Sequence, residues 1–161
     1  MKLSTNFTSE EFIRSATAAR GGIDNNMDKE QTARAKELCK TILQPLRDEV
    51  GKAMNISSGF RSLKVNKKIG STSKSQHTKG EAADFSIPGM KVPAICKLII
   101  KLGLPYHQLI DEFSEGGQGW VHVSIAHKGQ EPRKQYLQAR RSSTGKTVYT
   151  EISRNGKKSK P

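Results

Sequence analysis

The chain has 161 residues, with 28 lysines and arginines against 15 acidic residues and a formal net charge of +13. This length suits one domain with its own core, and no run approaches the roughly 18 apolar residues of a membrane-spanning helix. Met1–Phe7 carries a positive charge but no apolar segment, so we expect no secretory signal peptide. We expect one domain over residues 1–153 and a basic, flexible tail over residues 154–161.

The positive charge predicts affinity for polyanions such as nucleic acid, anionic lipid or acidic envelope polymers. Nucleic acid is disfavoured, because the chain has neither paired CxxC motifs nor a helix-turn-helix pattern, and its basic residues are not interleaved with aromatic ones. The two cysteines, Cys39 and Cys96, lie far apart among apolar neighbours. This favours buried free thiols over a disulfide framework, as in a protein made in a reducing cytoplasm.

Two capping patterns predict the starts of helices in the first third of the chain. Thr8 with Glu11 and Asp28 with Gln31 each have the spacing of a capping box. After Asp28, apolar residues recur at spacings of three and four, which indicates a longer amphipathic helix. Pro45 should kink or divide that helix near its end. We expect these helices to form a layer behind a sheet.

The rest of the chain predicts strands joined by glycine-rich loops. The expected strands cover residues 54–58, 82–87, 106–113 and 119–125, and the last two form a hairpin. Residues 93–102 form an amphipathic helix that ends at Gly103. Residues 131–138 fit a helical turn or a strand, and residues 147–152 alternate like an edge strand. The predicted class is α+β, with a small antiparallel sheet backed by helices in a single domain.

Alternation along the predicted hairpin sorts its side chains between two faces. Every second residue from Val121 is apolar, so this set faces the core and His122 lies on the opposite face. The same parity places Glu112 on the face of His122. It places Asp111 and Phe113 toward the core.

Two histidines and one aspartate predict a metal site. His77 and Asp84 stand in the run SQHTKGEAAD, and His122 stands in the run WVHVS. Histidine nitrogen and carboxylate oxygen are ordinary zinc ligands, and a catalytic zinc takes three protein ligands and keeps one position open. We therefore interpret these three residues as the ligands of one Zn2+. A structural zinc would need a fourth ligand, and the sequence places no cysteine near the three.

These motifs resemble the M15 family of zinc peptidases. The resemblance rests on SSGFRS, the SQHTKGEAAD run and GWVHVS, in that order, and extends from about Phe7 to Ser124. The family includes D-Ala-D-Ala carboxypeptidases and phage endolysins that cut peptidoglycan peptides. The similar sequences are of the compact single-domain type found in phage and prophage genomes. The resemblance implies a hedgehog/DD-peptidase-like fold.

The resemblance also implies substrate-binding residues. Arg61, in SSGFRS, matches a substrate-binding arginine of the family, and its planar fork can hold a carboxylate through two parallel hydrogen bonds. Ser75 and Gln76 either bind substrate or orient His77. Trp120 either forms a wall of the groove or packs against the domain.

Hydrolysis further needs a base that takes a proton from water and returns it to the leaving amine. We assign this role to Glu112, from strand parity and from the Glu-Phe pair that precedes the WVHVS strand in similar sequences. Glu115, in the loop of the hairpin, is the alternative. His107 and His127 are interpreted as polar residues at the surface or at strand ends.

We expect a monomeric, zinc-dependent peptidoglycan peptidase that serves as a phage or prophage endolysin. It would be an L-Ala-D-Glu endopeptidase or a D-Ala-D-Ala carboxypeptidase. The alternatives are an inactive wall-binding module of the same fold and a virion-associated wall hydrolase. The expected partners are peptidoglycan peptides and anionic envelope polymers, with no nucleic acid. Such a protein is made in the bacterial cytoplasm and reaches the cell wall after release, or inside a phage particle.

Overall fold

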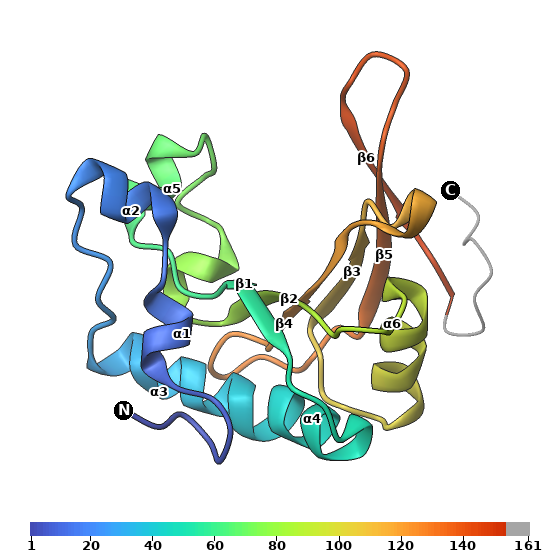
Figure 1. Ribbon diagram of the computed structural model, residues 1–161, viewed down its shortest axis with the longest axis horizontal. Helices are drawn as coiled ribbons and strands as arrows, with labels where there is room; N and C mark the ends of the chain where they lie inside the picture. The colour runs from blue at the N-terminus through green and yellow to red at the C-terminus, as the bar shows by residue number, and fades with distance from the viewer. Residues whose placement is uncertain (154–161) are drawn as a thin grey trace.

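A six-stranded sheet of order β1-β2-β4-β3-β5-β6 organises the computed structural model, which describes residues 1–153 (Figure 1). The expected basic tail, residues 154–161, lies outside the described residues. The strands are β1 Asn55–Ser58, β2 Ala82–Ser86, β3 Gln108–Glu112, β4 Trp120–Ser124, β5 Gln135–Arg141 and β6 Thr147–Glu151. Together with the helices they confirm the α+β class.

One strand pair departs from the expected antiparallel sheet. All neighbours are antiparallel except β3 and β5, which run parallel. The reason lies in the connection: after β4 the chain reverses through residues 125–134 and returns along the far side of β3. Because β4 is antiparallel to β3, a strand that reverses again must be parallel to it. Residues 131–138 were expected to form either a helical turn or a strand, and the structure has strand β5 from Gln135 onward. Strand β6 is the edge strand that the sequence predicts for residues 147–152.

The helices begin where the sequence places their caps. They are α1 Ser9–Ile13, α2 Ala16–Gly21, α3 Lys29–Leu38, α4 Gln44–Val50, α5 Leu63–Lys68 and α6 Val92–Lys101, with shorter turns η1 Cys39–Leu43, η2 Gln76–Lys79 and η3 Glu115–Gly117. Thr8 and Asp28 both form complete capping boxes, which confirms the two predicted starts. Within residues 1–153, no helix combines the length and apolar character needed to cross a membrane.

Pro45 divides the long helix as expected. It has no N–H, and its ring would collide with the carbonyl group four residues earlier in a regular α-helix. The turn before it, η1, is widened to a π-helix, in which the Gln44 N–H donates to the Cys39 carbonyl. The helix axis thus continues from α3 into α4 with one wide turn between them.

One face of the sheet carries the main core. Helices α3, α4 and α6 cover this face (Figure 1), and their apolar side chains pack against alternate residues of β2, β3 and β4. Phe85, Val121 and Val123 are fully buried there. Cys39 and Cys96 are buried free thiols in the same core, as predicted. The opposite face of the same strands stays open for the polar residues that alternate with them.

Phe113 does not face the main core, so the alternation argument is wrong at this residue. Its φ angle is +57°, in the left-handed region, which turns the chain and reverses the side-chain direction at the end of β3. The Phe113 ring packs against a second cluster of Ile110, Leu137 and Ala139. It also contacts the Trp120 ring at a centroid distance of 5.6 Å.

Candidate metal centre

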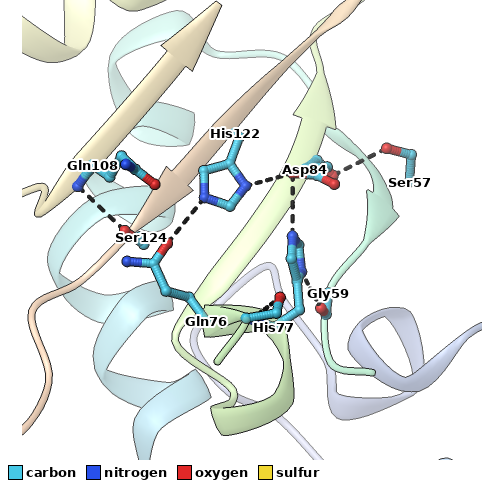
Figure 2. Close-up of polar contacts among 9 residues, drawn as sticks. Ser57, Gly59, Gln76, His77, Asp84, Gln108, His122 and Ser124 are labelled. Atoms are coloured by element: carbon cyan, nitrogen blue, oxygen red, sulfur yellow. Dashed lines mark hydrogen bonds and ion pairs between the residues drawn. The ribbon is translucent and has the colours of Figure 1, made fainter. Parts of the chain in front are cut away.

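Three elements bring His77, Asp84 and His122 together. His77 lies on η2, while Asp84 in β2 is the direct cross-strand neighbour of His122 in β4. One donor atom from each residue lies within 4.8 Å of the other two. Asp84 Oδ1 is 2.9 Å from His122 Nδ1 and 3.4 Å from His77 Nε2. Figure 2 shows both imidazoles directed at the aspartate.

Each imidazole is held by its other nitrogen. His77 Nδ1 lies 2.6 Å from the Gly59 carbonyl oxygen, and His122 Nε2 lies 3.2 Å from Gln76 Oε1 (Figure 2). Because both partners are acceptors, the tautomers that donate to them leave His77 Nε2 and His122 Nδ1 as the nitrogens available to a metal ion. Gln76 therefore orients His122, whereas the sequence suggested His77. Ser75 caps the turn instead, since its Oγ accepts the His77 backbone N–H.

This donor set fits a zinc ion. Burial by itself would raise the pKa of Asp84, but His77 and His122 hold it well below the usual range of a carboxyl group. The aspartate is therefore ionised, beside two oriented histidine nitrogens. Two nitrogens and one carboxylate oxygen are a common zinc set, and three protein ligands leave a position open for water or substrate.

Two glycines allow the close backbone contacts that hold His77 in place. At Gly80, φ is +75° and an added Cβ would lie 2.4 Å from the backbone oxygen of Gln31 in α3. At Gly59, an added Cβ would lie 2.8 Å from the Phe12 backbone in α1. These close approaches seat η2 and the end of β1 directly on the helices, and so fix the backbone around His77.

The three residues open into a cavity of about 540 Å³. Its lining comes from the loop before η2, from the open face of the sheet and from β6. The lining residues are Arg61, Ser71, Thr72, Lys74, Ser75, Gln76, His77, Asp84, Gln108, Ile110, Glu112, Trp120, His122 and Tyr149. The cavity therefore contains the proposed metal ligands, the proposed substrate-binding residues and Glu112, but not the alternative base Glu115.

A family model described as Peptidase M15 matches residues 5–124. The chain belongs to this family. No curated protein matches the chain. The matched stretch contains His77, Asp84 and His122, together with Arg61 and Glu112, and it ends with the last residue of β4. Strands β5 and β6 lie beyond it.

In this M15 peptidase the acidic residues of the β3 hairpin have different surroundings. Asp111 is fully buried on the core face and pairs with Arg140, at 3.1 Å from Nη1. Arg140 Nε also pairs with Glu115 Oε2 at 2.5 Å, and neither acid lines the cavity. Glu112 lines it and has no hydrogen-bond or ion-pair partner among residues 1–153. Burial and the Asp84 charge raise the pKa of Glu112 to about 7, against the opposing effect of His122 and Arg61.

Arg61 lines the cavity, and part of its guanidinium group is not used in hydrogen bonds within residues 1–153. Its Nε atom is buried and has no hydrogen-bond partner within residues 1–153. Burial lowers the pKa of Arg61, while the Asp84 and Glu112 charges act against that shift. Asn25, for which we predicted no role, holds the backbone on both sides of Arg61. Its side chain donates to the Phe60 carbonyl at 3.2 Å and accepts the Ser62 N–H at 2.7 Å.

Sequence reasoning missed Glu81, Lys74 and Tyr149. Glu81 is buried next to η2, where it pairs with Arg34 Nε at 2.8 Å and with His127 Nδ1 at 3.0 Å. This links the metal motif to α3 and gives His127 a defined contact at the end of β4. Lys74 and Tyr149 both line the cavity. The only available signal for Tyr149 was the alternation of the edge strand, which does not reveal what the strand faces.

Proposed function

We propose that this M15 peptidase hydrolyses peptide bonds of bacterial peptidoglycan, with a zinc ion held by His77, Asp84 and His122. The observation that carries the proposal is a single cavity that joins this three-donor set to an unpaired carboxyl group, that of Glu112. Within residues 1–153 the group has three donors and no fourth, which suits catalysis better than structural support. The unpaired Glu112 supports hydrolysis over a binding module that has lost activity.

The residues of the site have distinct roles in hydrolysis. When bound, zinc supplies a Lewis acid that polarises the substrate carbonyl and lowers the pKa of water in the site. Glu112 accepts a proton from the attacking water and donates it to the departing amine, a role that suits a carboxyl group with a pKa near neutrality. The Gly59 carbonyl and Gln76 keep the imidazoles of His77 and His122 in place throughout.

The charge of the cavity points to an anionic peptide. Arg61 offers a planar donor group that suits a carboxylate, and the peptides of the bacterial wall carry free carboxylates. Lys74 also lines the cavity. Lys64, Lys67 and Lys68 of α5 are exposed and add positive charge to the surface of the protein. The same surface suits anionic envelope polymers, whose attraction would concentrate the protein at the wall.

We propose that the protein acts in lysis and is of phage or prophage origin. It would be either a free endolysin or a virion-associated hydrolase. Two bonds are compatible with a carboxylate held by Arg61: L-Ala-D-Glu, cut by an endopeptidase, and the terminal D-Ala-D-Ala, cut by a carboxypeptidase. In the first case the peptide continues on both sides of the bond. In the second, the carboxylate belongs to the leaving residue.

Digestion of purified peptidoglycan tests the proposal. The protein is incubated with wall, with and without a chelator, and the released muropeptides are identified by mass spectrometry. We expect new amino termini at one defined bond, loss of product with the chelator and recovery with added zinc. Glu112→Gln should abolish product release, whereas Glu115→Gln is the matched control outside the cavity. Intact wall peptides after incubation with the zinc-loaded protein would refute the proposal.

A further inference from the structure

The hairpin of β5 and β6 lies outside the family match, yet it completes the cavity. The matched stretch ends at Ser124, whereas β5 begins at Gln135 and pairs with β3 along its whole length. In Figure 1 this hairpin, coloured in orange-red, extends beyond the rest of the sheet. Arg140 ties it to β3 through the buried Asp111, and to the β3–β4 loop through Glu115. The hairpin is therefore anchored on β3, which carries Glu112, and on the loop that follows it.

The register places Tyr149 in line with Glu112. Glu112 pairs with Ala139 of β5, and Ala139 pairs with Tyr149 of β6, so all three share the open face of the sheet. Ala139 is fully buried and belongs to the small cluster against which the Phe113 ring packs. Tyr149 accordingly lines the same cavity as Glu112 and His122. Burial and the charges of Glu112 and Asp84 raise the pKa of Tyr149, as expected for a hydroxyl group near both acids.

The cavity thus has two chemically different sides. Arg61 follows β1, at one end of the strand order, and forms a cationic side with Lys74. Tyr149 lies on β6, at the other end, and gives that end an aromatic side, while Trp120 of β4 lines the cavity between the two ends. Although Tyr149 is 56% exposed, its ring is an apolar surface at the edge of an otherwise polar site. Aromatic rings supply large, rigid contact areas for a ligand.

We infer that Tyr149 is a specificity-determining residue, whose ring and hydroxyl group bind the part of the peptide that lies past Glu112 toward β6. The inference rests on the proposed function and adds a requirement for peptide length. Strands β4 and β6 are three strand spacings apart, roughly 14 Å at about 4.8 Å each. An extended peptide covers about 3.3 Å per residue. Only a peptide that continues for about four residues beyond the reacting bond therefore spans this distance and reaches Tyr149.

Binding measurements with short and long peptides test this requirement. The probes are the stem pentapeptide of the wall and the dipeptides D-Ala-D-Ala and L-Ala-D-Glu. Affinity is read from the fluorescence of Trp120, the single tryptophan of the chain, which lines the cavity. Zinc-loaded proteins carrying Glu112→Gln are used, so that the probe is not consumed. Values of kcat and KM are then measured with Glu112 restored.

Three substitutions separate the ring, the hydroxyl group and the strand. Tyr149→Ala should raise Kd and KM for the pentapeptide about tenfold, the scale of one lost aromatic contact. It should change kcat and the dipeptide affinities less than about twofold. Tyr149→Phe keeps the ring and should fall between Tyr149→Ala and the wild type. The matched control is Val148→Ala, because Val148 is 48% exposed on the same edge strand but faces away from Glu112.

The outcomes distinguish this inference from the proposed function. Equal pentapeptide Kd values for wild type and Tyr149→Ala overturn the inference, while wild-type cleavage leaves the function standing. An equal loss for dipeptide and pentapeptide also overturns it, because Tyr149 would then act on the metal centre. A wild-type protein that neither binds nor cleaves any of the probes refutes the proposed function, and the inference falls with it.

Discussion

Replacing Glu112 by glutamine should remove activity and, in the metal-free protein, increase stability. Folding raises the pKa of this carboxyl group from 4.5 to about 7, so the folded state resists its ionisation. At 1.36 kcal/mol per pKa unit the difference corresponds to roughly 3 kcal/mol. Since the side chain is partly exposed, we reduce the figure to roughly 1–2 kcal/mol. The penalty is absent below pH 4.5, where the group is protonated in both states, and is complete above about pH 7.

Glutamine has the shape of the protonated acid but cannot ionise, so it avoids this penalty. We expect equal free energies of unfolding for wild type and Glu112→Gln at pH 4, and a more stable variant at pH 8. Bound zinc favours the carboxylate, so the advantage should shrink in the zinc-loaded protein. Turnover should fall by roughly 10²- to 10⁴-fold, the range for loss of a general base.

The assay combines urea unfolding at both pH values, with and without chelator, and cleavage of the stem peptide. Asp111→Asn is the comparison for a carboxyl group outside the cavity, and zinc content is measured for each protein. A Glu112→Gln variant that keeps more than a tenth of wild-type turnover would exclude Glu112 as the base. A stability difference that is the same at pH 4 and pH 8 would show that its carboxyl group does not have the raised pKa.

Three other predictions address the remaining parts of the site. His77→Ala, like alanine at either other ligand, should remove most bound zinc and all peptidase activity; full zinc occupancy by metal analysis would contradict the ligand assignment. Arg61→Lys keeps the charge but loses the two-pronged geometry, so kcat/KM should fall more than about tenfold at unchanged zinc content, and wild-type kinetics would exclude the carboxylate contact. Arg140→Gln leaves the buried Asp111 unpaired and should cost about 3 kcal/mol in thermal or urea unfolding. Most of that loss should be recovered in the Asp111→Asn/Arg140→Gln double variant; no recovery would mean that the pair is not the cause.

The parts of the molecule that the sequence predicted depend on local rules. Capping at Thr8 and Asp28, the interruption of the long helix near Pro45 and the facing of Glu112 toward His122 each follow from a few adjacent residues. The grouping of the metal ligands also follows from the sequence, but through the resemblance rather than through local rules. Asp84 and His122 are far apart in the chain, and the pairing of β2 with β4 brings them together.

The parts that the sequence did not predict depend on long-range pairing or on one unusual backbone angle. The left-handed φ of Phe113 reverses the alternation on which the core assignment relied. The parallel pairing of β5 with β3 determines what Tyr149 faces, and no pattern inside β6 encodes that partner. Gln76 was expected beside its sequence neighbour His77, but the helical turn of η2 directs it to His122 across the site.

The availability of Glu112 follows from how the chain pairs its other acids. Near the centre, Asp84 is held by two histidines, while Arg140 pairs with Asp111 and Glu115, and Arg34 pairs with Glu81. Glu112 and Arg61 are close enough for their charges to interact, yet no ion pair joins them in residues 1–153. A direct pair would lower the pKa of Glu112 and occupy the donors of Arg61. Because the two groups stay apart, the carboxyl group remains able to exchange a proton near neutral pH, and the guanidinium group remains able to bind a substrate carboxylate.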